Sequence, residues 1–252
     1  MLNLLSNLSK PERVYLGISM VLIACGLALH QTLISELLTA DFNRVSRVFG
    51  DLFWGSISEF GDAHLVLPLV VLLCLRKPSD GWTIAIAVIG AAVAAGGLKD
   101  FFDAPRPSME NVYQLHVIGP EVKTRSFPSG HTLTAFTGLG LIALLRQQYL
   151  WLVMAALVAL SRMAMGAHWL ADVLFGAGLG LLVALAAAWA HGRIRSGGRK
   201  LNWTVLPVLA LFAAINVHYD STLPSDPFVD AFALWVLTVF GYRLFQQRQN
   251  KA

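Results

Sequence analysis

Charged side chains are scarce in this sequence. Asp, Glu, Lys and Arg make up 13% of the 252 residues, whereas apolar residues make up 56%. Soluble globular domains carry about 25% charged residues, so a soluble chain of this size would expose too much apolar surface to water. Disorder is excluded as well, because disordered chains combine low hydropathy with high charge. The composition therefore indicates a chain that lies in a membrane.

Cysteine is also scarce. The two cysteines, Cys25 and Cys74, both lie inside apolar runs. A disulfide framework needs several paired cysteines, and a cysteine metal site needs a close-spaced cluster of them. Neither pattern is present, and no grouped carboxylates or His/Cys cluster suggests another metal site. We expect no metal and no cofactor.

Long uncharged runs are abundant instead. A membrane-spanning helix needs about 20 apolar residues. Five of the eight runs reach 18 residues and the other three need flanking residues such as Glu59, Asp62 or Arg162, which would have to avoid lipid. In the sixth run, Gly176 and Gly180 favour close helix contact. The runs cover residues 14–35, 63–75, 81–98, 126–145, 147–161, 173–192, 201–219 and 231–242.

These runs predict an all-α, polytopic membrane helical bundle. Residues 1–192 would form a six-span core, and residues 193–252 would form a basic hinge followed by two further spans. The hinge is the strongly basic stretch at 191–200. No internal repeat or heptad array competes with this organisation.

The basic residues predict the orientation of the bundle. If the N-terminus is cytoplasmic, most Lys and Arg residues fall on the inner side, while the inner acidic residues are Glu12 and Asp80 alone. Positive loops stay inside, so both termini are expected to be cytoplasmic. The net charge of +4 and the pI near 9.3 then follow from membrane topology, and no nucleic-acid partner is indicated.

Polar residues gather at three places on the predicted outer side. At 99–107, Pro105 and Pro107 hold Arg106 in a stiff segment after Lys99, and both cations suit a phosphate. At 128–131, Ser129 and Gly130 begin a helix whose free N–H groups favour anions, with His131 in its first turn. The alternative interpretation of 99–107 is a basic pair that reaches the lipid headgroups. The alternative interpretation of 128–131 is an ordinary Ser N-cap beside an interfacial histidine.

The third place combines Ser161, Arg162, His168 and Asp172. His168 and Asp172 are four residues apart and would share one helix face. A carboxylate that binds one imidazole nitrogen leaves the other free to react, although a helix-capping ion pair is the structural alternative. Taken together, the three places form an anion site with two histidines and three cations, which matches a dianionic phosphate.

These blocks also resemble a known family. Lys-x6-Arg-Pro at 99–107, Pro-Ser-Gly-His at 128–131 and Ser-Arg-x5-His-x3-Asp at 161–172 are the three signatures of the type 2 phosphatidic acid phosphatases. The resemblance covers about residues 30–192 and does not extend to the tail. It implies an integral membrane lipid phosphate phosphatase that needs no metal.

The resemblance also implies a role for each residue. His168 would be the nucleophile that forms a phosphohistidine, Asp172 would orient it, and His131 would protonate the leaving oxygen. The phosphate would be bound by Lys99, Arg106, Ser129, Gly130 and Arg162. The site would face the periplasm or exterior of a bacterial inner membrane, where it meets its lipid substrate among the membrane lipids.

Two other functions remain open at this stage. A lipid phosphotransferase would use the same phosphohistidine and pass the phosphate to a second lipid. A lipid-binding or lipid-translocating protein would need no histidine pair. Candidate substrates are polyprenyl diphosphate, phosphatidylglycerol phosphate, phosphatidic acid and phosphorylated lipid A. The 103–127 loop, which includes His116, is a candidate contact for the headgroup.

Overall fold

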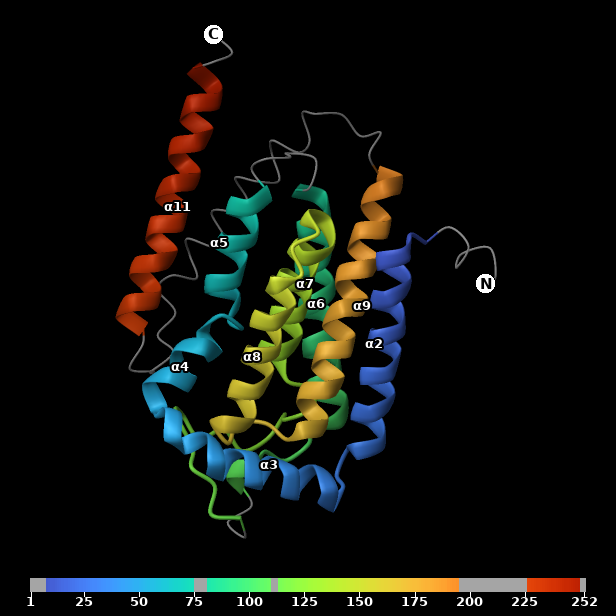
Figure 1. Ribbon diagram of the computed structural model, residues 1–252, viewed down its shortest axis with the longest axis vertical. Coiled ribbons are helices and arrows are strands. Elements are labelled where there is room, and N and C mark those ends of the chain that lie inside the picture. The colour runs from blue at the N-terminus through green and yellow to red at the C-terminus, as the bar shows by residue number, and fades with distance from the viewer. Residues whose placement is uncertain (1–7, 75–80, 110–112, 195–225, 250–252) are drawn as a thin grey trace.

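The computed structural model describes residues 8–74, 81–109, 113–194 and 226–249. Within these residues every regular element is a helix (Figure 1), which confirms the all-α prediction. In chain order they are α2 (Lys10–Leu29), α3 (Leu33–Ser46), η1 (Arg47–Phe49), α4 (Asp51–Glu59), α5 (Ala63–Cys74), α6 (Gly81–Phe102), η3 (Pro107–Met109), α7 (Gly130–Arg146), α8 (Leu150–Ala164), α9 (Leu170–Ile194) and α11 (Asp226–Gln249).

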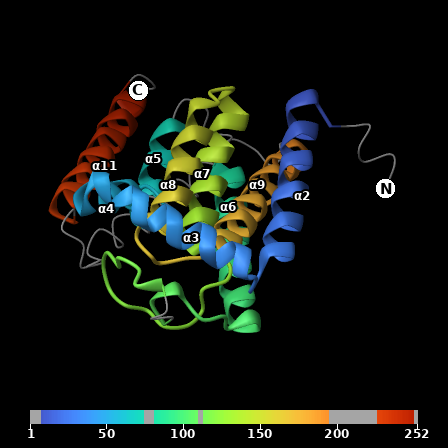
Figure 2. The same cartoon turned by 60° about the horizontal axis from the view of Figure 1, so that its bottom comes forward.

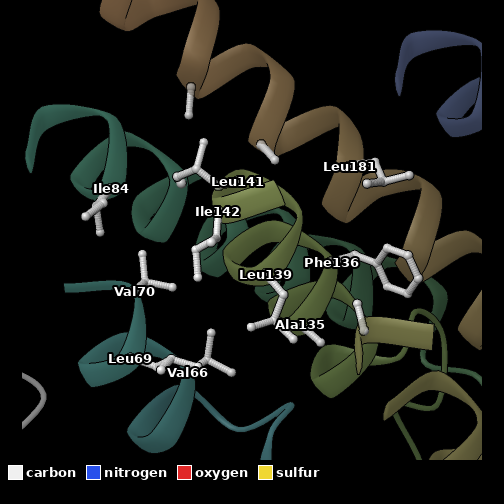
Figure 3. Close-up of a cluster of buried hydrophobic side chains, with 14 of the residues drawn as sticks. Val66, Leu69, Val70, Ile84, Ala135, Phe136, Leu139, Leu141, Ile142 and Leu181 are labelled. Atoms are coloured by element: carbon white, nitrogen blue, oxygen red, sulfur yellow. The ribbon is translucent and has the colours of Figure 1, made fainter. Parts of the chain in front are cut away.

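The bundle is built around α7 and α9. Helix α7 packs against α5, α6, α8 and α9, and α2 packs along α9. Figure 3 shows the apolar core between these helices, where Leu139 and Ile142 of α7 lie among side chains of α5 and α6, with Leu181 of α9 nearby. Packing in this core positions the helix ends at which the three polar places, 99–107, 128–131 and 161–172, lie.

Glycines allow α9 to approach α7 closely. A Cβ atom added to Gly176 would lie 2.8 Å from the Ser129 carbonyl oxygen, and one added to Gly180 would lie 2.6 Å from the Leu133 carbonyl oxygen. No side chain fits at these distances, so the two backbones are in direct contact. The expectation that small residues of the sixth run mediate close packing is confirmed.

Three helices among the described residues are long and apolar enough to cross a membrane, namely α2, α6 and α9. Helices α4 and α5 qualify together as a fourth, bent by 53° at the break between them, and α8 is a shorter apolar helix. These are the features of an integral membrane protein. The count of six spans plus two stays a prediction, since the run at 201–219 lies outside the described residues.

The first apolar run does not continue to residue 35 as one helix. Helix α2 ends at Leu29, and Thr32 starts α3 by accepting a hydrogen bond from the Ser35 N–H at 3.3 Å. Helix α3 then crosses the end of the bundle below α7, α8 and α9 (Figure 2). Both segments are apolar, and hydropathy does not reveal the N-cap turn between them. The sequence prediction therefore treated α2 and the start of α3 as one run.

Helix α3 is amphipathic. Its exposed apolar side chains include Leu33, Ile34, Leu37 and Leu38, whereas Ser35, Thr39 and Asn43 are buried against the bundle. An exposed apolar face of this kind is typical of helices that lie in the membrane interface. The buried polar face becomes part of the site described below.

Helix α11 lies beside α5 at the edge of the bundle (Figure 1). The rings of Phe60 and Phe232 are 6.4 Å apart, and Val236 is buried. Helix α9 ends at Ile194, so the first two residues of the predicted tail, 193 and 194, are still part of α9. The hinge from 195 to 200 lies outside the described residues.

Candidate active site

His168 and Asp172 are in contact where α8 connects to α9. His168 is 1% exposed, and its Nδ1 lies 3.3 Å from Asp172 Oδ2. The same carboxylate oxygen accepts the Trp169 N–H at 2.9 Å and the Ser126 hydroxyl at 2.5 Å. Because Nδ1 is engaged, Nε2 is the ring nitrogen left for chemistry. Helix α9 begins at Leu170, so the expectation of a shared helix face is wrong: His168 precedes the helix.

The end of α8 places His168 in this position. The Ala167 and His168 N–H groups both donate to the Arg162 carbonyl oxygen, at 3.0 and 3.2 Å. Gly166 adopts a φ of 64°, a left-handed conformation that glycine takes without strain. This turn accounts for the five-residue spacing between Arg162 and His168.

Helix α3 fixes the start of α9. The Leu170 N–H donates to Thr39 Oγ1 at 2.9 Å, and the Ala171 N–H donates to Ser35 Oγ at 3.0 Å. Side-chain oxygens thus satisfy N–H groups that a helix start leaves without an intrahelical partner. Sequence analysis missed both hydroxyls, because they come from a helix that it did not predict.

The side chain of Lys99, which belongs to α6, reaches the start of α7. Ser129 is the N-cap, and its own N–H donates to the Asp172 carbonyl oxygen at 3.2 Å, which joins α7 to the His168 region. A Cβ atom added to Gly130 would lie 3.2 Å from Lys99 Nζ. The missing side chain of Gly130 therefore lets the ammonium group approach the N–H groups of this helix start, and both favour an anion.

The two arginines are held differently. Arg162 is buried and its Nη1 donates to Ser58 Oγ in α4 and contacts Met165 Sδ at 3.7 Å, while its Nε finds no partner among the described residues. Arg106 donates to two backbone carbonyl oxygens, at Thr124 from Nε (3.2 Å) and at Ala167 from Nη1 (3.4 Å). A buried guanidinium with an unpaired N–H suits an anionic ligand.

The charges around His168 keep it neutral. Burial first, and then the cations Arg106, Arg162 and Lys99, hold the pKa of the His168 imidazole well below its usual range. All three sequence-predicted cations thus act electrostatically on this one ring. A neutral imidazole has a free lone pair, which is what a nucleophile needs.

His131 has a partner that sequence analysis missed. Its side chain is 31% exposed, and its Nε2 lies 3.5 Å from Asp62 Oδ2, in the break between α4 and α5. Gly61 packs directly on it, since a Cβ atom added there would lie 2.9 Å from His131 Cβ. The only sequence signal was the set of polar residues Glu59, Asp62 and His64 at the edge of an apolar run.

An apolar cavity of about 190 Å³ lies between α5, α6 and α7. Two lining residues, Ala95 and Thr134, are one helix turn from Lys99 and His131. One end of the cavity therefore lies close to Lys99 and His131, on the side toward the bundle interior. It is lined almost entirely by aliphatic residues: Ala63, Val66, Leu67, Val70, Ile84, Ala87, Val88, Ala91, Ala92, Ala95, Thr134, Thr137, Gly138 and Leu141.

Metal ligands are not grouped in the part of the chain that the structure describes. None of its clusters brings together three or more His, Cys, Asp or Glu side chains in a way that could hold a metal ion. Cationic side chains and helix N–H groups are grouped here instead, and both suit an anion.

Comparison with known proteins places these residues in a family. The PAP2 superfamily model matches residues 80–196, which contain all three signature blocks. The bacitracin transport permease protein BcrC of Bacillus licheniformis is 36% identical over 141 residues, covering 53% of this chain and 68% of that protein. The chain belongs to the PAP2 superfamily. The predicted family is therefore confirmed.

Further proteins are similar to this chain in sequence or in fold. An undecaprenyl-diphosphatase of Sulfolobus acidocaldarius is 27% identical over 54% of this chain and 67% of its own length. The crystal structure of Aquifex aeolicus LpxE matches with a TM-score of 0.56 and 24% identity, over 64% of this chain and 98% of that one. A Bacillus subtilis PAP2-type phosphatidylglycerolphosphate phosphatase matches with a TM-score of 0.56 and 20% identity, over 71% and 96%.

Proposed function

We propose that this chain is a metal-independent lipid phosphate phosphatase of the membrane. The observation that carries the proposal is the arrangement around His168. A buried, neutral imidazole is held by Asp172 and influenced by Lys99, Arg106 and Arg162, beside a helix start. Such a site can bind a phosphate dianion and attack its phosphorus without an ion, because fixed cations and N–H dipoles stabilise the charge of the transition state.

The reaction proceeds in two steps. The lone pair of His168 Nε2 attacks phosphorus, the bond from phosphorus to the lipid oxygen breaks, and His131 gives that oxygen its proton. Water then attacks the phosphohistidine, His131 takes the proton of this water, and phosphate leaves while His168 becomes neutral again. Lys99, Arg106, Arg162, Ser129 and Gly130 bind the phosphate oxygens in both steps.

The cavity between α5, α6 and α7 supports a lipid as the substrate. Its lining extends along α6 from Ala95 to Ile84, which is about 16 Å at 1.5 Å per residue. An apolar chain in this cavity would leave its phosphate at Lys99 and His131. The names of the relatives, an undecaprenyl-diphosphatase and a phosphatidylglycerophosphatase B (Bacillus subtilis, 28% identical), support lipid monophosphates and diphosphates as the substrate class.

The topology is part of the proposal. Residues 1–192 form the six-span catalytic core, and residues 193–252 add a hinge and two spans. Both termini face the cytoplasm of a bacterial cell, because the positive loops lie there. The site then opens on the periplasmic or outer face, at the end of the bundle that α3 crosses (Figure 2).

The test is phosphate release by the detergent-purified protein on a panel of lipid monophosphates and diphosphates. We expect release from at least one lipid, unchanged by EDTA and absent in His168→Ala. Activity that EDTA abolishes and Mg²⁺ restores would contradict the metal-independent mechanism. Transfer of the phosphate to a second lipid without release would identify a phosphotransferase, and no turnover of any lipid would favour a lipid-binding protein.

A further inference from the structure

A second set of titratable side chains lies at the break between α4 and α5 and on either side of it, with Glu59 at the end of α4 and His64 at the start of α5. Glu59 and His64 are almost fully buried, at 2% and 4% side-chain exposure, and Asp62 is at 23%. Burying carboxylates is costly unless they are paired. The mechanism above uses none of the three, and no signature block contains them.

These side chains form a chain that ends on His131. His131 Nε2 is 3.5 Å from Asp62 Oδ2, and Asp62 Oδ1 is 3.1 Å from His64 Nδ1. His64 Nε2 is in turn 3.4 Å from Glu59 Oε2. Imidazole and carboxylate alternate along the chain, so each ring has an acid neighbour and Asp62 is held between two rings.

The break is packed closely against the site. A Cβ atom added to Gly61 would lie 2.5 Å from Val158 Cγ1 of α8 and 3.0 Å from the His131 carbonyl oxygen. Ser58, in the last turn of α4, accepts a hydrogen bond from Arg162. The same short segment thus contacts the proposed acid and one of the phosphate-binding cations, which fixes Asp62 relative to both.

We propose that Asp62 is a positioning residue for the general acid His131, and that His64 and Glu59 hold Asp62 in place. This inference rests on the proposed function. Because Asp62 engages Nε2, the proton for the leaving oxygen comes from Nδ1, and the ring cannot turn the wrong nitrogen toward the substrate. The geometry is the counterpart of Asp172 on His168, with a different purpose: one carboxylate orients a nucleophile, and the other an acid.

Electrostatics give Asp62 a second task. Burial of the His131 ring and then the positive charges of Arg162, Lys99 and Arg106 disfavour its charged form, whereas Asp62 supplies the negative charge that favours it. Three nearby cations disfavour an imidazolium, so a general acid in this position needs a carboxylate beside it. Removing that carboxylate would leave His131 with less of the protonated form that the first step consumes.

The experiment compares two synthetic amphiphiles with the same alkyl chain. One is an alkyl phosphate, whose alkoxide leaving group needs a proton, and the other is a nitrophenyl phosphate, whose leaving group does not. The measured quantity is kcat/KM for phosphate release, because it covers the steps up to loss of the first leaving group and excludes the later hydrolysis. The variants are Asp62→Asn and, as a matched control, Asp41→Asn, which alters an exposed carboxylate in a surface ion pair with Arg44.

In Asp62→Asn we expect kcat/KM for the alkyl phosphate to fall by about 10²-fold, within the range that general acids contribute, and the nitrophenyl phosphate to change far less. Asp41→Asn is expected to match wild type on both. Equal losses on the two substrates, or no loss, would overturn the role of Asp62 while leaving the phosphatase intact. If wild type turns over neither these amphiphiles nor any lipid phosphate, the proposed function itself fails.

A second variant covers the case in which Asp62→Asn does not fold. His64→Leu keeps Asp62 and His131 but removes the ring that holds Asp62, whereas His64→Asn retains an N–H donor near the Nδ1 position that faces Asp62. We expect His64→Leu to show the same selective loss on the alkyl phosphate, about tenfold, which is what the loss of one supporting hydrogen bond would cause, and His64→Asn to recover most of it. An equal effect of His64→Leu on both substrates would overturn the inference.

Discussion

The two histidines of the site are held in contrasting ways. His168 is buried, and its carboxylate partner also accepts a backbone N–H and a serine hydroxyl. His131 is partly exposed, and its carboxylate partner comes from a break between two helices. If His168 is the nucleophile, it must meet phosphorus along one line, which suits a ring that is fixed from several sides. If His131 is the acid, it must follow a leaving lipid, which suits a partly exposed ring one helix turn from Thr134 in the cavity lining.

The largest effect is expected at the buried histidine. His168→Ala removes the only proposed nucleophile, so phosphate release should fall to background for every lipid monophosphate and diphosphate. Asp172→Asn should fold normally yet lose most activity, because an amide can hold the imidazole in the wrong tautomer. Both are measured as phosphate release by purified protein of verified monodispersity. Wild-type rates in His168→Ala would reject the nucleophile.

Replacing the partly exposed histidine should slow some substrates more than others. His131→Ala is expected to slow lipid monophosphates by about 10²- to 10⁴-fold, and lipid diphosphates less, because a phosphate leaving group needs less help from a proton. The measurement is kcat/KM on a monophosphate and a diphosphate of the same lipid. Equal loss on both would show that His131 binds phosphate rather than acting as the acid.

Ser126 is a further residue that holds the buried His168–Asp172 pair. Its hydroxyl donates to Asp172 Oδ2 at 2.5 Å and also lies 3.4 Å from His168 Nδ1. Hydrogen bonds to charged groups are worth about 1.5–3 kcal/mol, so Ser126→Ala should lower kcat by about 10- to 100-fold. Ser108→Ala is the matched control, since that hydroxyl donates to the Val122 carbonyl oxygen in an exposed part of the loop. Similar rates in the two variants would remove Ser126 from the site.

The neutral state of His168 can be observed directly. Since its pKa is held well below the usual range, its ring should stay neutral as the pH falls through the ordinary histidine value of about 6.5. NMR of protein labelled at histidine, with the His168 signal assigned by its loss in His168→Gln, measures this titration. A midpoint near the ordinary value would contradict the account of burial and neighbouring cations. The unfolded chain takes up this proton first, so the depressed pKa also lowers stability as the pH falls through that range.

The smallest effect is expected from the hydroxyl that caps α9. Thr39→Ala removes the acceptor of the Leu170 N–H and should cost about 1 kcal/mol of stability, seen as a thermal midpoint lower by about 2–4 °C. Thr238→Ala, which removes a hydroxyl that bonds the Leu234 carbonyl oxygen within exposed α11, is the control. An unchanged midpoint in Thr39→Ala would show that α3 does not fix the start of α9.

How far the sequence predicts this site depends on the distance between partners. His168 and Asp172 are four residues apart, and Lys99, Gly130 and Arg162 lie at the ends of apolar runs, so spacing and hydropathy were enough to find them. Asp62 lies 69 residues before His131, and Ser35 and Thr39 lie on a helix that hydropathy merged with the first run. Tertiary packing brings these residues to the site, and the spacing of residues along the sequence does not reveal which distant residues pack together.

Capture of the phosphorylated enzyme tests the central claim most directly. Wild-type protein is mixed briefly with a lipid carrying a radiolabelled terminal phosphate, quenched in alkali, digested and mapped. The account predicts an acid-labile, alkali-stable phosphate on the peptide that contains His168, present in wild type and absent in His168→Ala. Rapid turnover in wild type with no labelled peptide, or with the label on another residue, would contradict it.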